Sequence, residues 1–117
     1  MAYIDGFVIP VPTARKQEFI DHARAVDALF LERGATRVVE CWGDDVPAGT
    51  HTDFPRAIAA TAEETVVFSW IEWPDKATRD AAAEKMQTDP RMAAQPMPFD
   101  GKRMIFGGFA SVVGLEH

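Results

Sequence analysis

The chain is 117 residues long, which is enough for one domain with a modest core and too short for two. Hydrophobic residues make up 47% and charged residues 26% of it, a globular composition that excludes a disordered or collagen-like protein. The formal net charge is −6 and the basic residues are scattered. We therefore expect no nucleic-acid partner, and no membrane partner because no apolar stretch reaches spanning length.

The lone cysteine and the N-terminal segment indicate the cellular location, and the C-terminal residues indicate where the domain ends. Cys41 has no second cysteine to pair with, and the N-terminal segment does not resemble a secretion signal, so we expect a cytoplasmic protein. Cys41 also lacks a CxxC motif or a basic activator, which favours an unreactive thiol in a buried strand. Residues 115–117, Leu-Glu-His, resemble the start of a vector-encoded histidine tag, so the domain is expected to span residues 1–114.

The N-terminal third predicts a strand followed by an amphipathic helix. Residues 3–11 are rich in β-branched and aromatic side chains, and the strand ends at prolines that cannot donate to a ladder. Thr13 is the expected N-cap of the helix. Phe19, Ala23 and Val26 recur at helical spacing, and Gly34 is the expected stop.

The remainder predicts three more strands and a second helix. A strand over 36–42 leads into a long loop rich in Gly, Asp and Pro that runs to about residue 64, with a short helical turn at 57–61. A strand over 65–73 is followed by a helix over 76–88, which Asp75 begins. Residues 89–101 are predicted as a loop. The last strand covers 102–113, where Gly107-Gly108 favours a bulge or a close backbone approach.

The order of these elements predicts an α+β fold of the ferredoxin-like type, β-α-β-β-α-β, with two helices on one face of a four-stranded antiparallel sheet. The strand over 65–73 is apolar on both faces: Phe68 and Trp70 point one way and Ile71 the other. Two helices can cover only one face. We therefore expect a homodimer that pairs the other faces as a dimeric α/β barrel.

Five segments resemble a bacterial family of unknown function, the YbaA-like proteins. They are YIDGFV at 3–8, VECWGDDVP at 39–47, TDFPRA at 52–57, ETVVFSW at 64–70 and MPFDGKRMIFGGF at 97–109. The resemblance spans nearly the whole chain and implies membership of the dimeric α/β-barrel superfamily. That superfamily includes cofactor-free monooxygenases, isomerases, dehydratases and plain ligand binders, so it does not select one chemistry.

The histidines and the loop carboxylates are the first candidates for chemistry. His22 borders the buried face of the first helix, where it would act as a catalytic general base; the alternative is a surface histidine. The loop gathers Asp44, Asp45, His51 and Asp53, which would bind an ion or move protons if they converge. No established ligand spacing is present, so no metal is expected, and turn carboxylates are the alternative.

Aromatic and basic residues form the second candidate site. Trp42 and Trp70 are predicted to line an apolar pocket in which Arg56 or Arg103 holds an anion, although such aromatics also occur as plain core or dimer interface. No phosphate loop, nucleophile elbow, flavin or nicotinamide motif is present, so we expect no cofactor.

Three functions remain open from the sequence. The first is a homodimer that binds or converts a small apolar or aromatic metabolite. The second is a non-catalytic dimeric binding or stress-response module. The third is an RNA-associated protein, which the acidic charge disfavours.

Overall fold

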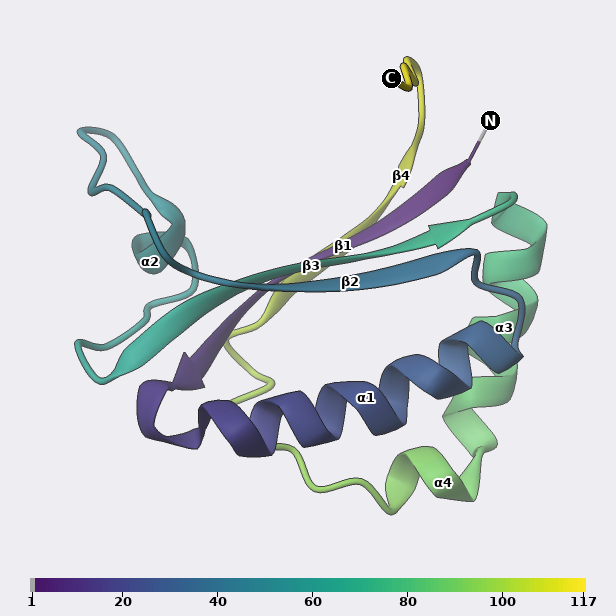
Figure 1. Cartoon of the computed structure of the whole chain (residues 1–117), viewed down its shortest axis with the longest axis horizontal. Coiled ribbons are helices and arrows are strands. Elements are labelled where there is room, and N and C mark those ends of the chain that lie inside the picture. The colour runs from purple at the N-terminus through teal and green to yellow at the C-terminus, as the bar shows by residue number, and fades with distance from the viewer. Residues whose placement is uncertain (1) are drawn as a thin grey trace.

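A four-stranded antiparallel sheet with helices on one face makes up the protein, which we describe over residues 2–117 of a computed structural model (Figure 1). The strands are β1 (Tyr3–Pro12), β2 (Arg37–Trp42), β3 (Glu64–Trp73) and β4 (Ile105–Ala110), in the spatial order β2-β3-β1-β4. The helices are α1 (Lys16–Glu32), α2 (Phe54–Ala57), α3 (Lys76–Thr88) and α4 (Pro90–Ala93), and a 3-10 turn covers Thr13–Arg15. The predicted ferredoxin-like order is confirmed.

Several predicted boundaries are wrong for local reasons. Thr13 does not cap α1, because its hydroxyl lies 2.7 Å from that of Thr65 and the 3-10 turn comes before the helix. The helical turn expected at 57–61 lies earlier, as α2, because Asp53 accepts a hydrogen bond from the backbone N–H of Arg56. The segment predicted as a loop contains the single turn α4, which Asp89 caps. Strand β4 covers only part of the predicted 102–113.

Glycines act at two of the predicted positions. Gly34 has φ +110° and ends α1, as expected. Gly108 pairs in register with Asp5, so no bulge forms there. A Cβ at Gly108 would instead collide with the Tyr3 hydroxyl and with Arg79. The side chains of Tyr3 and Arg79 thus approach the backbone of Gly108 closely, which accounts for glycine at this position.

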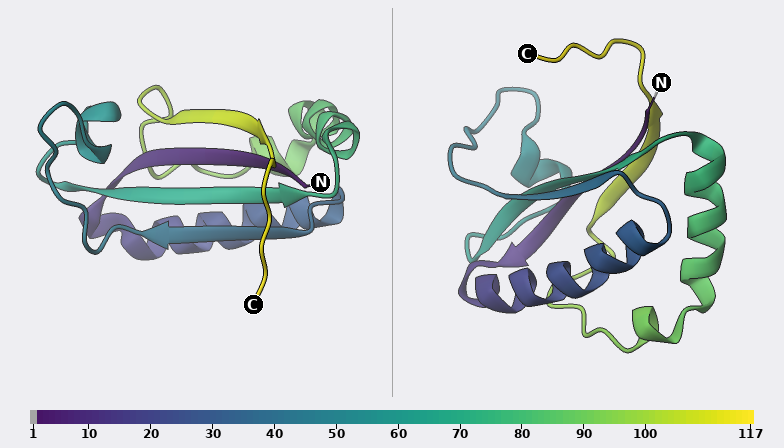
Figure 2. Two further views of the ribbon diagram at one scale, coloured as in Figure 1. Left: turned by 90° about the horizontal axis from the view of Figure 1, so that it is seen from above. Right: turned by 45° about the vertical axis from the view of Figure 1, so that its right-hand side comes forward.

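One face of the sheet and the helices enclose the core. Phe19, Ala23 and Val26 of α1 are buried against the sheet, and α3 buries Ala82 and Met86. Figure 2 shows α1, α3 and α4 together on this side of the sheet. The hydrophobic stripe of α1 sits at the predicted 3.6-residue spacing, which is why this helix lies along the sheet.

Ion pairs fasten the helices at their ends. Asp5 of β1 accepts hydrogen bonds from Arg79 of α3 and from the indole N–H of the buried Trp73. Asp89, between α3 and α4, accepts from Arg33 and Arg91. The contact of Asp89 with Arg33 ties the start of the 89–104 segment to the end of α1.

The opposite face of the sheet is not covered by α1, α3 or α4 (Figures 1 and 2). Its large exposed apolar side chains include Phe68, Ile105 and Phe109, which are 45%, 45% and 61% exposed. The loop that contains α2 rises at one end of this face, where the Phe54 ring packs edge-on against Phe68 at 6.0 Å (Figure 1). We call this surface the open face.

Candidate acid–base site between the helices and the sheet

A cavity of about 180 Å³ lies between α1, the sheet and the 89–104 segment. Most of its lining is aromatic, aliphatic or thioether, including Phe7, Phe30, Ile71, Phe99 and Met104. The polar lining residues are His22, Asp27, Glu40, Ser69 and Gln95. Among residues 2–117, no lysine or arginine lines it.

Asp27 and Glu40 form a carboxyl pair in the wall of this cavity. Asp27 comes from the buried side of α1, one residue after Val26, and Glu40 comes from β2 directly opposite Ser69 of β3. The two carboxyls lie close enough for each to shift the pKa of the other, and Ser69 also acts on the pKa of Glu40. The buried Oε2 atom of Glu40 has no hydrogen-bond partner within residues 2–117. Contact between two carboxyls therefore requires a proton on one of them.

Of the two carboxyls, Glu40 has the pKa that is raised further. Burial and the nearby charge of Asp27 raise the pKa of Glu40 to about 8, and burial raises the pKa of Asp27 to about 6. At neutral pH the pair thus contains one carboxylic acid and one carboxylate. A proton donor and a proton acceptor stand side by side in an apolar cavity, which is the arrangement that acid–base catalysis uses.

His22 contributes a neutral imidazole to the same cavity. Burial lowers its pKa, and the nearby backbone of Pro96 opposes part of this shift. Phe99 packs edge-on against it at 5.7 Å between ring centroids. Its Nδ1 atom is buried and has no partner within the described residues. This nitrogen is available to accept a hydrogen bond from a bound molecule.

The four residues predicted to form an aromatic–arginine pocket are not brought together. Trp42 packs against Phe19 on the helix side, whereas Trp70 lies on the open face. Arg56 hydrogen-bonds to Asp53 and to the carbonyl of Gly49, and so it holds the loop in shape.

Arg103 is likewise occupied. Its guanidinium makes two 2.7 Å hydrogen bonds to Glu64, and these lower the pKa of Glu64 to about 2. It also bonds to Asp100 and to the carbonyl of Ala59. Both arginines therefore lie in structural networks outside the cavity.

The loop carboxylates do not converge either. Asp53 caps α2 and also accepts from the backbone N–H of Gly49. Asp44, Asp45 and His51 are exposed. Within residues 2–117 no three His, Cys, Asp or Glu side chains are grouped as metal ligands.

Asp27 and Glu40 were missed by the sequence interpretation although both carry a signal. Glu40 is the only charged residue between Val38 and Trp42, in a strand predicted to be buried. Asp27 follows Val26 directly and lies four residues after Ala23, on the border of the apolar stripe of α1. Their pairing across two elements becomes visible only once α1 lies over β2.

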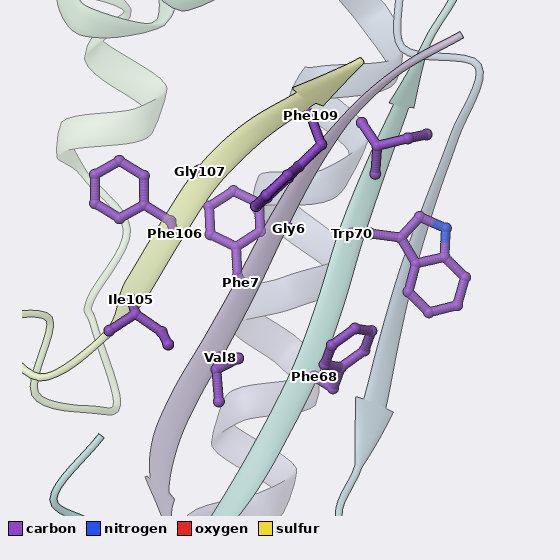
Figure 3. Close-up of a pocket in the computed structure, with 10 residues that line it drawn as sticks. Gly6, Phe7, Val8, Phe68, Trp70, Ile105, Phe106, Gly107 and Phe109 are labelled. Atoms are coloured by element: carbon purple, nitrogen blue, oxygen red, sulfur yellow. The ribbon is translucent and has the colours of Figure 1, made fainter. Parts of the chain in front are cut away.

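A second concave surface lies on the open face, lined by Ile4, Val8, Phe68, Trp70, Ile105 and Phe109. Figure 3 shows that these side chains come from β1, β3 and β4. The Phe109 ring lies close over Gly6 and Gly107, which face each other on neighbouring strands. Apart from Trp70 and its Nε1–H, which bonds to Glu72, this surface offers little polar chemistry.

The sequence matches a family model described as a protein of unknown function, DUF1428, over residues 2–101. It is also 54% identical over 115 residues to the uncharacterized protein YbaA of Escherichia coli K12, covering 97% of this chain and 98% of that one. The chain belongs to the DUF1428 family. The YbaA-like resemblance is thereby confirmed. The YbaA protein of Shigella flexneri matches to the same extent.

Two solved structures share the fold of this DUF1428 protein. A dimeric ferredoxin-like protein from an uncultured marine organism has a TM-score of 0.63 and 11% identity, with 97% of this chain and 98% of that chain covered. A mutant of SnoaB, a cofactor-independent oxygenase from Streptomyces nogalater, has a TM-score of 0.57 and 14% identity, with 99% of this chain and 98% of that chain covered. At these identities the likeness shows the fold alone. No helix in residues 2–117 is long and apolar enough to cross a bilayer.

Proposed function

We propose that this DUF1428 protein binds a small ring-containing carbonyl compound in the cavity and catalyses its enolisation without a cofactor. The observation that carries the proposal is the carboxyl pair of Asp27 and Glu40, which faces an apolar, cation-free cavity. Two adjoining carboxyls whose pKa values are raised by burial destabilise a fold, so their presence in a cavity points to use in chemistry. His22 is the third member of the site.

The cavity volume limits the ligand to about one ring. An apolar cavity of roughly 150 Å³ accommodates benzene. The 180 Å³ found here would hold a single ring with a short polar substituent. The aromatic walls favour such a ring, and the acid pair and His22 offer partners for one or two oxygen atoms.

The proton transfers balance within the carboxyl pair. The Asp27 carboxylate removes a proton from the carbon next to the carbonyl, while the Glu40 carboxylic acid gives its proton to the carbonyl oxygen. The C–H bond breaks, an O–H bond forms and the product is the enol. A proton then passes from Asp27 to Glu40 and restores the pair. No oxidant or external base is consumed.

Deuterium exchange of acetophenone in D2O, followed by NMR, tests this proposal. We expect exchange of its methyl protons above the buffer rate in the wild type and a loss of at least about tenfold in Asp27→Asn and Glu40→Gln. Glu84→Gln, an exposed change on α3, is the control. Exchange at the buffer rate in the wild type at saturating acetophenone would refute the catalytic proposal. Binding without exchange would leave a ligand-binding module.

We also propose that the protein is a cytoplasmic homodimer that pairs its open faces. The support is the row of exposed Phe68, Ile105 and Phe109, which favours association because water contact with such a surface is costly. The ferredoxin-like structural relative is described as dimeric, which agrees with this arrangement. The cavity lies on the other side of the sheet, so pairing of the open faces leaves it accessible.

A further inference from the structure

A groove of about 440 Å³ runs along the outside of the molecule between α1 and the edge strand β2. Ile20, Ala28 and Leu31 of α1 line one side, and Trp42 of β2 lines the other. The Asp27–Glu40 pair contributes to its floor, so the groove and the cavity share part of one wall. Leu31 is 49% exposed, which leaves an apolar surface open along the groove.

Arg24, one of the two basic residues of the groove, differs from the other arginines in the described part of the chain. Seven arginines have a carboxylate within ion-pair distance, namely Arg15, Arg33, Arg37, Arg56, Arg79, Arg91 and Arg103. Arg24 is the one arginine for which residues 2–117 offer no such partner. It lines the groove together with Lys16, which also has no carboxylate partner in the described chain and lies 5.2 Å from the centre of the Trp42 ring.

The charges of the groove favour an anion even though the whole chain is acidic. Among the described residues that line it, Lys16 and Arg24 are two cations, and Asp27 and Glu40 are the acidic groups, which share one proton at neutral pH. Lys16 and Arg24 lie two helical turns apart on α1, with Ile20 between them. Their long side chains can therefore converge on one group held above Ile20.

We propose that this groove binds an amphipathic monocarboxylate, with its carboxylate between Lys16 and Arg24 and its aryl or short alkyl part along Ile20, Ala28 and Leu31. Guanidinium and ammonium groups bind carboxylates through charge-assisted hydrogen bonds, and the apolar lining accounts for the body of such a ligand. The site is distinct from the cavity and does not depend on proton transfer there.

The test compares 4-phenylbutyrate with 4-phenyl-1-butanol, which has the same apolar body without the charge. Binding is measured by titration of amide signals in 1H–15N NMR spectra at pH 7 and low salt. We expect the carboxylate to shift signals of α1 and β2 around Ile20, Ala28 and Cys41, and to bind roughly fivefold or more tightly than the alcohol. Because the contacts are exposed, 0.5 M salt should remove most of this difference.

Three variants locate the site. Lys16→Met with Arg24→Gln should reduce the affinity of the carboxylate to that of the alcohol, and Ala28→Glu, which places a negative charge in the groove, should do the same. Lys85→Met, an exposed lysine of α3, is the matched control and should bind as the wild type does. All positions are exposed, so the fold should persist; a thermal melt checks this.

Several outcomes would overturn the proposal. Equal affinity for the two compounds, or unchanged binding in the Lys16/Arg24 variant, would remove the anion site. Signal changes confined to the cavity or to the open face would also remove the anion site. Changes confined to the cavity would be compatible with the proposed function of the cavity. If the same α1 and β2 signals move when the protein alone is diluted, the groove belongs to a contact with a second copy instead.

Discussion

Replacing Glu40 by Gln is expected to stabilise the protein at pH 8 and to leave its stability nearly unchanged at pH 5. The pKa of Glu40 rises from 4.5 to about 8 on folding, so at neutral pH the folded state holds a proton that the unfolded state has released. Stability from this group is fully present below about pH 4.5 and is lost as the pH rises through about 8. Gln cannot ionise, and so it removes this loss.

The gain in unfolding free energy follows from the difference between the pKa of Glu40 in the unfolded state, 4.5, and in the folded state, about 8. Each pH unit corresponds to about 1.4 kcal/mol, which sets an upper bound of about 5 kcal/mol. Glu40 is only half-buried, so solvent screening reduces the expected gain in unfolding free energy to about 2 kcal/mol at pH 8. About half of it should develop between pH 6.5 and 8. Burial lowers the pKa of His22, and this shift makes the folded state less stable as the pH falls. Its effect on stability is therefore opposite in sign to that of Glu40 and lies below pH 6.5.

Urea unfolding followed by tryptophan fluorescence measures the prediction at pH 5, 6.5 and 8, at one protein concentration and one ionic strength. The wild type should lose stability between pH 6.5 and 8, Glu40→Gln should not, and the control Glu84→Gln should behave as the wild type. A wild-type unfolding free energy that does not change over this window would refute the reasoning. So would a Glu40→Gln variant that keeps the wild-type pH dependence.

Three further changes test the rest of the framework. Arg103→Met leaves the nearly buried Glu64 without its partner and should lower the unfolding free energy by about 2 kcal/mol at pH 7, measured by urea titration. Gly108→Ala drives a methyl group into the Tyr3 hydroxyl and should cost about 1–3 kcal/mol, seen as a lower melting temperature. Phe109→Glu places a charge on the open face and should convert the proposed dimer into a monomer in sedimentation velocity.

Each of these changes has a matched control nearby in the chain. Lys102→Met removes a neighbouring exposed cation and should leave stability unchanged. Gly114→Ala adds a methyl group where no atom lies within 4 Å. Val112→Glu introduces the same charge at a position that is 88% exposed and outside the sheet. An effect of a control as large as that of its partner would contradict the corresponding mechanism.

The fold was largely predictable because the hydrophobic periodicity agrees with the helix-capping and turn residues along the chain. The helix predicted over 76–88 has those bounds in the structure, since Asp75 accepts from the backbone N–H of Thr78 and fixes its start. Predicted element boundaries were wrong where a side chain expected to cap a helix bonds to a residue far along the chain instead. Thr13 is the clearest case, because its hydroxyl is taken by Thr65, 52 positions along the chain.

The candidate site was only half predictable. His22 was selected from its place beside the apolar stripe of α1, and it does line the cavity. The predicted aromatic–arginine pocket does not form, because a residue such as Arg56 bonds to Asp53 within its own loop. Asp27 and Glu40 are 13 positions apart in sequence and meet only when α1 crosses β2. Helical and strand periodicity describe each element separately, so they do not predict that Asp27 and Glu40 lie next to each other.

The shared wall couples the groove to the cavity. A carboxylate bound between Lys16 and Arg24 would lie near Asp27 and Glu40 and would disfavour loss of their shared proton. Coupling of binding equilibria is reciprocal, so loss of that proton should weaken binding of the carboxylate. We therefore expect the affinity for 4-phenylbutyrate to fall as the pH rises from 6.5 to 8.5.

Isothermal titration calorimetry across that range measures the change, and Glu40→Gln provides the comparison. In this variant the residue at position 40 stays neutral, so the affinity should no longer depend on pH over this interval. The neutral 4-phenyl-1-butanol should bind equally at each pH in both proteins. If the wild-type affinity for the carboxylate stays constant between pH 6.5 and 8.5 while Glu40 ionises, the groove and the cavity act as independent sites despite their common wall.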